Sequence, residues 1–156
     1  MFRFLSASIF FFIFFISCSV CHSQSSKPDP VKISIPNQAA SAVKSSPAFA
    51  EIILRKTELE AELESLLVTY TEDFPKIKEI RFETDSLKKG LERLSAVKSA
   101  ESSKLTLALG KLMVRKAELE TYLWDLRKKY DDNHPEVKRA RRKIEIYESA
   151  IREILG

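Results

Sequence analysis

The fold is decided by a six-residue stretch that occurs twice: Arg55-Lys56-Thr57-Glu58-Leu59-Glu60 and, 60 positions later, Arg115-Lys116-Ala117-Glu118-Leu119-Glu120. An ungapped comparison of residues 55–94 with residues 115–154 gives 11 identities in 40 pairs. Tyr70 and Pro75 match Tyr130 and Pro135, so both copies keep the same Tyr-to-Pro spacing. We therefore interpret the chain as an internal duplication with a 60-residue period.

The composition around this stretch is typical of long helices. Between positions 47 and 156, Ala, Glu, Lys, Leu and Arg occupy 63 of 110 positions. This composition argues against a β-sandwich, a barrel or a nucleotide-binding α/β domain. Gly occurs only at positions 90, 110 and 156, which excludes a Gly-rich loop that holds phosphate.

Each copy carries two seams in which residues recur at alternating spacings of three and four, as a coiled coil requires. The first seams are Ile52, Lys56, Leu59, Leu63, Leu66 and Tyr70, and Leu112, Lys116, Leu119, Leu123, Leu126 and Tyr130. The second seams are Ile77, Ile80, Thr84, Leu87, Leu91 and Leu94, and Val137, Ala140, Ile144, Tyr147, Ile151 and Ile154. We expect the Lys of each first seam to lay its stem along the seam with its ammonium in water.

A turn separates the two seams of each copy. Pro suits the first turn of a helix and pushes the residue before it out of the helical region, so a new helix starts at each Pro. Asp73 or Asn133 is expected to cap that helix. The residues of this turn motif are Tyr70, Phe74, Pro75, Tyr130, His134 and Pro135. The predicted helices cover 48–70, 75–96, about 103–130, and 135–155.

The pattern predicts an all-α fold of two antiparallel helical hairpins, at 47–96 and 97–156, in a coiled-coil or four-helix arrangement. The join between the hairpins has two interpretations. A loop at about 97–103 gives two separate helices, which we prefer because the seam turns polar there and four Ser residues gather. The alternative is one bent helix across 75–130.

The first 23 residues have the layout of an export signal: a basic start, an apolar core and a small-residue end. Three fates are open, namely a cleaved signal peptide, a lipoprotein signal with Cys18 as the lipidated residue, or an uncleaved anchor. Residues 24–46 are rich in Ser, Pro and Lys and are interpreted as a flexible tether. We therefore expect an exported protein of the periplasm or cell envelope.

No residue set predicts catalysis, a cofactor or a metal site. Asp131, Asp132 and His134 invite a metal hypothesis, but they stand in one turn without a partner elsewhere, and Phe74 replaces the His in the first copy. Capping and solvation explain these residues better. No nucleophile, base and orienting group stand out together. The sequence therefore predicts a protein that is not an enzyme.

A basic segment at 127–143 is the strongest charge feature. Its basic residues are Arg127, Lys128, Lys129, Lys138, Arg139, Arg141, Arg142 and Lys143. They stand against three acidic residues, Asp131, Asp132 and Glu136, so the local excess is five positive charges (8 − 3). Such a segment is either a solvated helical face or a site for acidic polysaccharide or lipid headgroups. Nucleic acid is not an expected partner, because no aromatic residues are interleaved for base stacking.

The stretch Leu126-Arg127-Lys128-Lys129-Tyr130, followed by His134-Pro135-Glu136-Val137-Lys138, resembles a periplasmic coiled coil. Similar stretches join two helices in polysaccharide chain-length determinant and exopolysaccharide-export proteins, the polysaccharide copolymerases. The resemblance implies an exported helical hairpin, with a link to polysaccharide biosynthesis or export. The function that we expect is a non-enzymatic scaffold of the bacterial cell envelope, with a protein partner or self-association through the heptad seams. The alternatives are a binder of anionic polymer or lipid through the basic segment, and a small holdase-like periplasmic protein.

Overall fold

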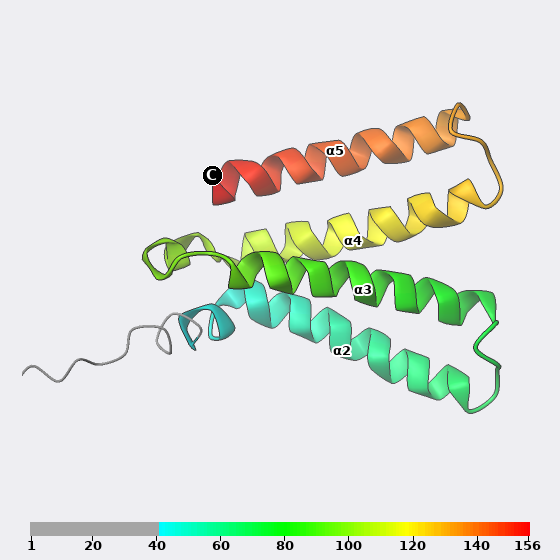
Figure 1. Ribbon diagram of the computed structural model, residues 1–156, viewed down its shortest axis with the longest axis horizontal. Helices are drawn as coiled ribbons and strands as arrows, with labels where there is room; N and C mark the ends of the chain where they lie inside the picture. The colour runs from blue at the N-terminus through cyan, green and yellow to red at the C-terminus, as the bar shows by residue number, and fades with distance from the viewer. Residues whose placement is uncertain (1–40) are drawn as a thin grey trace, which may run out of the picture. The chain divides into compact units, whose positions relative to one another are not determined.

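The computed structural model describes residues 41–156, which form an all-α arrangement (Figure 1). Its long helices are α2 (Pro47–Leu67), α3 (Pro75–Ser95), α4 (Leu107–Arg127) and α5 (Pro135–Leu155), each of 21 residues. The predicted all-α fold is confirmed. The export signal at 1–23, Cys18 and residues 24–40 of the predicted tether lie outside the described residues. The last residues of that tether, 41–46, are ordered instead of flexible, because 41–44 are helical and Val43 is buried in the core. Among residues 41–156, no helix has the length and apolar character that crossing a membrane requires.

The structure repeats with the period of the sequence. Helices α4 and α5 begin and end 60 positions after α2 and α3. The N-terminal caps repeat too, because the Ser46 hydroxyl accepts from the N–H of Phe49 at 3.2 Å and the Thr106 hydroxyl accepts from that of Leu109 at 3.3 Å. Such a side chain satisfies one of the backbone donors left free at a helix start. The two copies therefore follow the same local rules.

The join between the hairpins consists of a short 3-10 helix, η1 (Ser99–Lys104), with a few residues on either side. Helix α3 ends at Ser95 and α4 begins at Leu107, so residues 75–130 form two helices and not one bent helix. The carbonyl of Leu105 accepts from the N–H of Ala48 at 3.2 Å, and the Leu105 side chain is fully buried. This hydrogen bond therefore holds the join between the hairpins against the first turn of α2.

Helix α4 is central, because it packs against α2, α3 and α5, while α2 and α3 also pack against each other. In Figure 1 the helices α2 and α5 lie on opposite sides of the α3–α4 pair. The predicted seams are the buried faces. Their fully buried members include Ile52, Leu59, Ile77, Ile80, Leu87, Leu94, Val137 and Ile151.

The polar position of the first seam behaves alike in both copies. The side chains of Lys56 and Lys116 are only 22% and 23% exposed, so their stems are covered. Each ammonium meets the carboxylate four residues further on, Glu60 or Glu120, and Lys116 also lies 3.6 Å from Glu148 on α5. The stems follow the seam as expected, but the ammonium groups end on carboxylates at its edge.

Candidate functional site

The turn motif is held by a pair of stacked rings in both copies. The ring centroids of Tyr70 and Phe74 are 4.2 Å apart with planes at 10°, and those of Tyr130 and His134 are 4.0 Å apart at 15°. Offset stacking of this kind stabilises aromatic pairs. The structure therefore brings the predicted turn residues together in a stacked ring pair that either Phe or His can complete, and only His134 also accepts a backbone hydrogen bond.

An acid–Arg pair closes each turn next to the rings. Glu72 and Arg81 are 2.9 Å apart, and so are Asp132 and Arg141, 60 positions later. The hydrogen bond from Arg81 holds the pKa of Glu72 below its ordinary value. An identity comparison matches the two Arg residues but misses their partners, because Glu stands in one copy and Asp in the other.

The residues that suggested a metal make local contacts of the turn. Asp132 contacts Arg127 at 3.1 Å as well as Arg141, and an Asp131 carboxylate oxygen accepts from the N–H of Asn133 at 2.8 Å. His134 accepts from the N–H of Glu136 through Nδ1 at 3.3 Å. Over residues 41–156, no three His, Cys, Asp or Glu side chains are grouped so that they could hold a metal ion.

The cap prediction at the turn is wrong. The N-cap positions of α3 and α5 are Phe74 and His134, each directly before the Pro at the first helical position. Asp73 stands one residue too early and instead lies 2.8 Å from Lys78. Since Pro fixes where the helix begins, it also fixes which residue becomes the cap.

Six of the eight basic residues in segment 127–143 pair with four carboxylates nearby, so the segment keeps an excess of positive charge. The observed partners are Asp132 for Arg127 and Arg141, Asp125 for Lys128 and Lys129, Glu136 for Arg139, and Glu145 for Arg142. Lys128 also lies 3.1 Å above the Trp124 ring, a cation–π contact. Within the described part of the chain, Lys138 and Lys143 make no ion pair. The eight basic residues therefore do not form one site, because some lie at the turn and the others on the exposed side of α5.

A groove of about 570 Å³ lies between α3, α4 and α5. Its apolar lining includes Phe82, Met113, Leu123, Trp124, Ile144 and Ile151. Phe82 stacks on Trp124 with centroids 5.1 Å apart. At its edge Arg93 contacts Glu148 at 2.9 Å, and Ser86 donates to Glu120. The heptad pattern does not predict this groove, because three helices from both copies contribute to it.

An exposed apolar face runs along α2. We call it the α2 outer face, and it comprises Ala50, Ile53, Leu54, Thr57 and Ala61 of the helix and Val68 at its C-cap. Ile53, Leu54 and Val68 are 36%, 57% and 87% exposed, which is unusual for large apolar side chains that follow one helical stripe. Three acidic side chains, Glu58, Glu60 and Glu62, stand beside it on the same helix, and Glu64 continues its stripe three residues after Ala61.

The same face of α4 is covered. The residues 60 positions after Ile53, Thr57 and Ala61 are Met113, Ala117 and Thr121, which are 7%, 2% and 3% exposed. The first hairpin covers them, since both α2 and α3 pack on α4. Sequence reasoning missed the α2 outer face, although the 4-3-4 spacing of Ala50, Leu54, Thr57 and Ala61 forms a second stripe on α2.

No known family model matches this chain, and neither a characterised protein nor a solved structure shows similarity to it.

Proposed function

We propose that this protein is a non-enzymatic helical-hairpin scaffold that binds a protein partner through the α2 outer face. One observation carries the proposal: this face is exposed on α2, while the equivalent face of α4 is buried by a helical hairpin. Helices cover this face on α4, so the equivalent exposed face on α2 has a shape and composition that can also bind helices. Apolar grooves and faces of this kind receive amphipathic helices in many complexes.

The non-enzymatic part of the proposal is supported by what the polar residues of the turns do. Asp132, His134 and Arg141 are occupied in contacts that shape the turn, and the first copy builds the same turn with Glu72, Phe74 and Arg81. Ring stacking is the role that His134 shares with Phe74, and the further contact of His134 is a backbone cap of α5. These residues therefore fit a scaffold.

An exported location in the cell envelope belongs to the proposal as well. Its support is the signal-like pattern of residues 1–23, together with the Tyr-to-Pro turn that resembles the polysaccharide copolymerases. That resemblance is also the support for a link to polysaccharide biosynthesis or export.

The test is site-specific photo-crosslinking of the full chain in cells. A benzoyl-phenylalanine in place of Leu54 should give a defined adduct, which mass spectrometry identifies. The matched control carries the same residue at Glu92, an exposed position of α3 outside the face. Equal adducts from both positions, or none from position 54, would overturn the proposal.

A second candidate function rests on the outer side of α5. Lys138, Arg139, Arg142 and Lys143 are exposed and follow each other on that side. They favour an anionic polymer or lipid surface, through a salt-sensitive attraction. Changing all four to Glu should abolish binding to vesicles that contain anionic lipid, and binding that is unchanged and insensitive to salt would exclude this function.

A further inference from the structure

The two hairpins contact each other through unlike faces. Across the contact, Phe82 of α3 stacks on Trp124 of α4, and a Cβ placed on Gly90 of α3 would lie 3.5 Å from Met113 of α4. If a twofold axis related the two hairpins, each of these contacts would occur a second time between the equivalent residues of the other copy. Arg142 would then meet Glu64, and Ala150 would meet Ile53. Glu64 and Ile53 are instead exposed. The contact is therefore heterologous, and one such contact between two units leaves the complementary half of each unit unused.

One unused half is the α2 outer face, which corresponds to the α4 face that receives the first hairpin. The other half is on the second hairpin, and we call it the α4–α5 end face. It comprises Ala108, Lys111, Arg115, Arg142, Ile146 and Ala150, the residues 60 positions after those of the first hairpin that meet α4. Ile146 is 58% exposed and the Arg142 side chain 75% exposed, so this half is free.

The two free halves match each other in charge. We place a second molecule so that its second hairpin contacts α2 as the first hairpin contacts α4 within one chain. The contact of Phe82 with Trp124 is then replaced by Arg142 of the second molecule against Glu64 of the first. Helix α2 carries five Glu against two basic residues, a net charge of −3, while α5 carries six basic residues against four Glu, a net charge of +2. Opposite charges at corresponding positions favour this pairing and disfavour α2 against α2.

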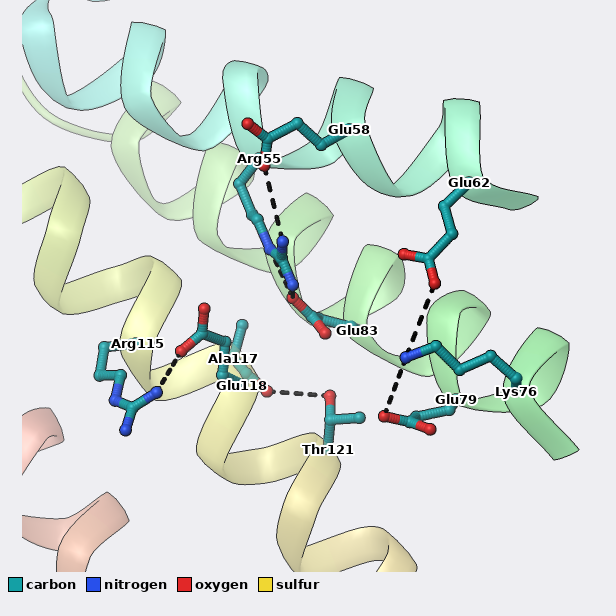
Figure 2. Close-up of polar contacts among 10 residues, drawn as sticks. All are labelled: Arg55, Glu58, Glu62, Lys76, Glu79, Glu83, Arg115, Ala117, Glu118 and Thr121. Atoms are coloured by element: carbon teal, nitrogen blue, oxygen red, sulfur yellow. Dashed lines mark hydrogen bonds and ion pairs between the residues drawn. The ribbon is translucent and has the colours of Figure 1, made fainter. Parts of the chain in front are cut away.

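A second transferred pair belongs to the polar layer drawn in Figure 2, where Arg55 and Glu58 stand on α2, Glu83 on α3, and Arg115 and Glu118 on α4. Burial acts to lower the pKa of Arg55, but the hydrogen bond and charge of Glu83, together with the charge of Glu118, raise it above its ordinary value. The attraction of Arg55 for Glu118 thus crosses from one hairpin to the other. Its transferred equivalent is Arg115 beside Glu58, again a pair of opposite charges.

We propose that the partner of the α2 outer face is a second copy of this chain, which docks its α4–α5 end face there, head to tail. This inference rests on the proposed function and names the partner of the same face. The intermolecular contact is looser than the internal one, because Ala50 takes the place of Gly110. At Gly110 an added Cβ would come within 2.9 Å of the Ala48 backbone, so two copies cannot approach as closely there. The association is therefore reversible and depends on concentration.

Sedimentation velocity of the full chain in non-ionic detergent, over a hundredfold range of concentration, tests the proposal. The wild type should form dimers and longer species as the concentration rises. Leu54→Glu and Ile146→Glu each alter one exposed half and should weaken association at least tenfold, whereas Lys88→Glu, an exposed control on α3, should not. A mixture of the Leu54→Glu and Ile146→Glu chains retains one intact pair of halves, so it should form a heterodimer and stop.

Charge exchange provides a second readout that a folding defect cannot imitate. Arg142→Glu and Glu64→Arg should each weaken self-association, and the mixture of both variants should restore it to within about threefold of the wild type. A wild type that stays monomeric, or a mixture that fails to recover, overturns the head-to-tail copy. Weakening by Leu54→Glu alone, with Ile146→Glu unaffected, would indicate a symmetric α2 contact and also overturns it.

The crosslink from position 54 distinguishes a failure of the proposed function from a failure of the proposed partner. An adduct with a different protein overturns the second copy as partner but sustains the proposed function. An adduct between position 54 and the α4–α5 end face of a second copy supports both. The absence of any adduct specific to position 54 overturns both.

Discussion

At the scale of single residues, the core is built largely from seam positions, which place apolar side chains on the buried faces of their helices. The seam positions Ile52, Leu59 and Ile77 are buried as predicted, because a heptad pattern identifies the face of a helix directly. The contacts made by polar side chains are less predictable. They depend on the direction in which a side chain leaves the turn, and identities between copies do not reveal that direction. Asp73 and His134 are examples, because Asp73, the expected cap of α3, pairs with Lys78, whereas His134 caps α5.

Thr84 is the residue whose substitution should stabilise the protein. Its hydroxyl is buried and has no hydrogen-bond partner within residues 41–156. Thr84→Val removes an unsatisfied polar group, so we expect the free energy of unfolding to rise by about 1 kcal/mol. Urea unfolding followed by circular dichroism measures this change. The control is Thr121→Val, because the Thr121 hydroxyl donates to the Ala117 carbonyl at 2.9 Å and its loss should bring no gain.

His134 should tolerate a ring and little else. His134→Phe recreates the Tyr–Phe pair of the first copy, so unfolding should shift by less than about 0.5 kcal/mol. His134→Ala removes the stacked ring and should cost about 1 kcal/mol. Thermal unfolding of the two variants gives the comparison. If the Phe variant is as unstable as the Ala variant, the imidazole does more than stack.

At the scale of elements, the sequence predicts the four long helices with errors of at most a few residues. The predicted end at position 70 lies three residues beyond Leu67, and the predicted start at about 103 lies four before Leu107. Pro75 and Pro135 fix helix starts because Pro cannot continue a helix, and these starts are predicted to the residue. Helix ends without such a residue depend on tertiary contacts, such as the bond from Ala48 to Leu105.

Two helical glycines give a matched test of how closely the helices pack. A Cβ added to Gly110 would lie 2.8 Å from the Glu51 Cβ and 2.9 Å from the Ala48 Cα and carbonyl oxygen. Gly110→Ala should therefore destabilise the protein by about 1–3 kcal/mol, since the backbone of α2 must move.

Gly90→Ala is the control for that substitution. Its added Cβ would lie 3.5 Å from Met113 and 3.8 Å from Ile52, which is ordinary contact. Ala is the better helix former, so Gly90→Ala should stabilise by about 0.5–1 kcal/mol. Chemical denaturation of both variants decides the matter, and a gain in stability from Gly110→Ala would show that α2 and α4 are not held that close.

At the scale of the whole molecule, the sequence predicts two hairpins but not how they meet. A heptad seam predicts which face of a helix is buried, but it does not predict which other helix packs against that face. Met113, for example, lies outside the predicted seams, and it is buried because α4 receives the first hairpin as well as α5. The groove beside Trp124 and the α2 outer face both follow from this choice of partners, so neither is visible in one copy of the repeat.

Acid should weaken the fold through its exposed ion pairs. Hydrogen bonds from Arg81, Lys78 and Lys129 lower the pKa values of Glu72, Asp73 and Asp125 below the ordinary 4.5 for Glu and 3.8 for Asp. The unfolded chain therefore takes up these protons first. The stabilisation is complete above the ordinary values and is lost as the pH falls through the lowered ones. Thermal unfolding measured between about pH 6 and pH 2 should show that the midpoint temperature of unfolding decreases once the pH is below about 4.

High salt is the control for this acid effect. These groups lie in solvent, so 1 M salt should reduce the pH dependence by screening. A midpoint that is independent of pH over this range would show that the pairs at the turns contribute nothing to the stability of the folded chain.

The contact between unlike faces also gives direction to anything built with it. One end of the molecule presents α2, with its net charge of −3, and the other presents α5, with +2. Every added unit repeats this order, so a row of any length keeps one acidic terminus and one basic terminus. A cationic surface or protein would meet such a row at the first terminus alone, and an anionic one at the second alone. The row would therefore have polarity, and its two termini could be anchored, capped or extended independently.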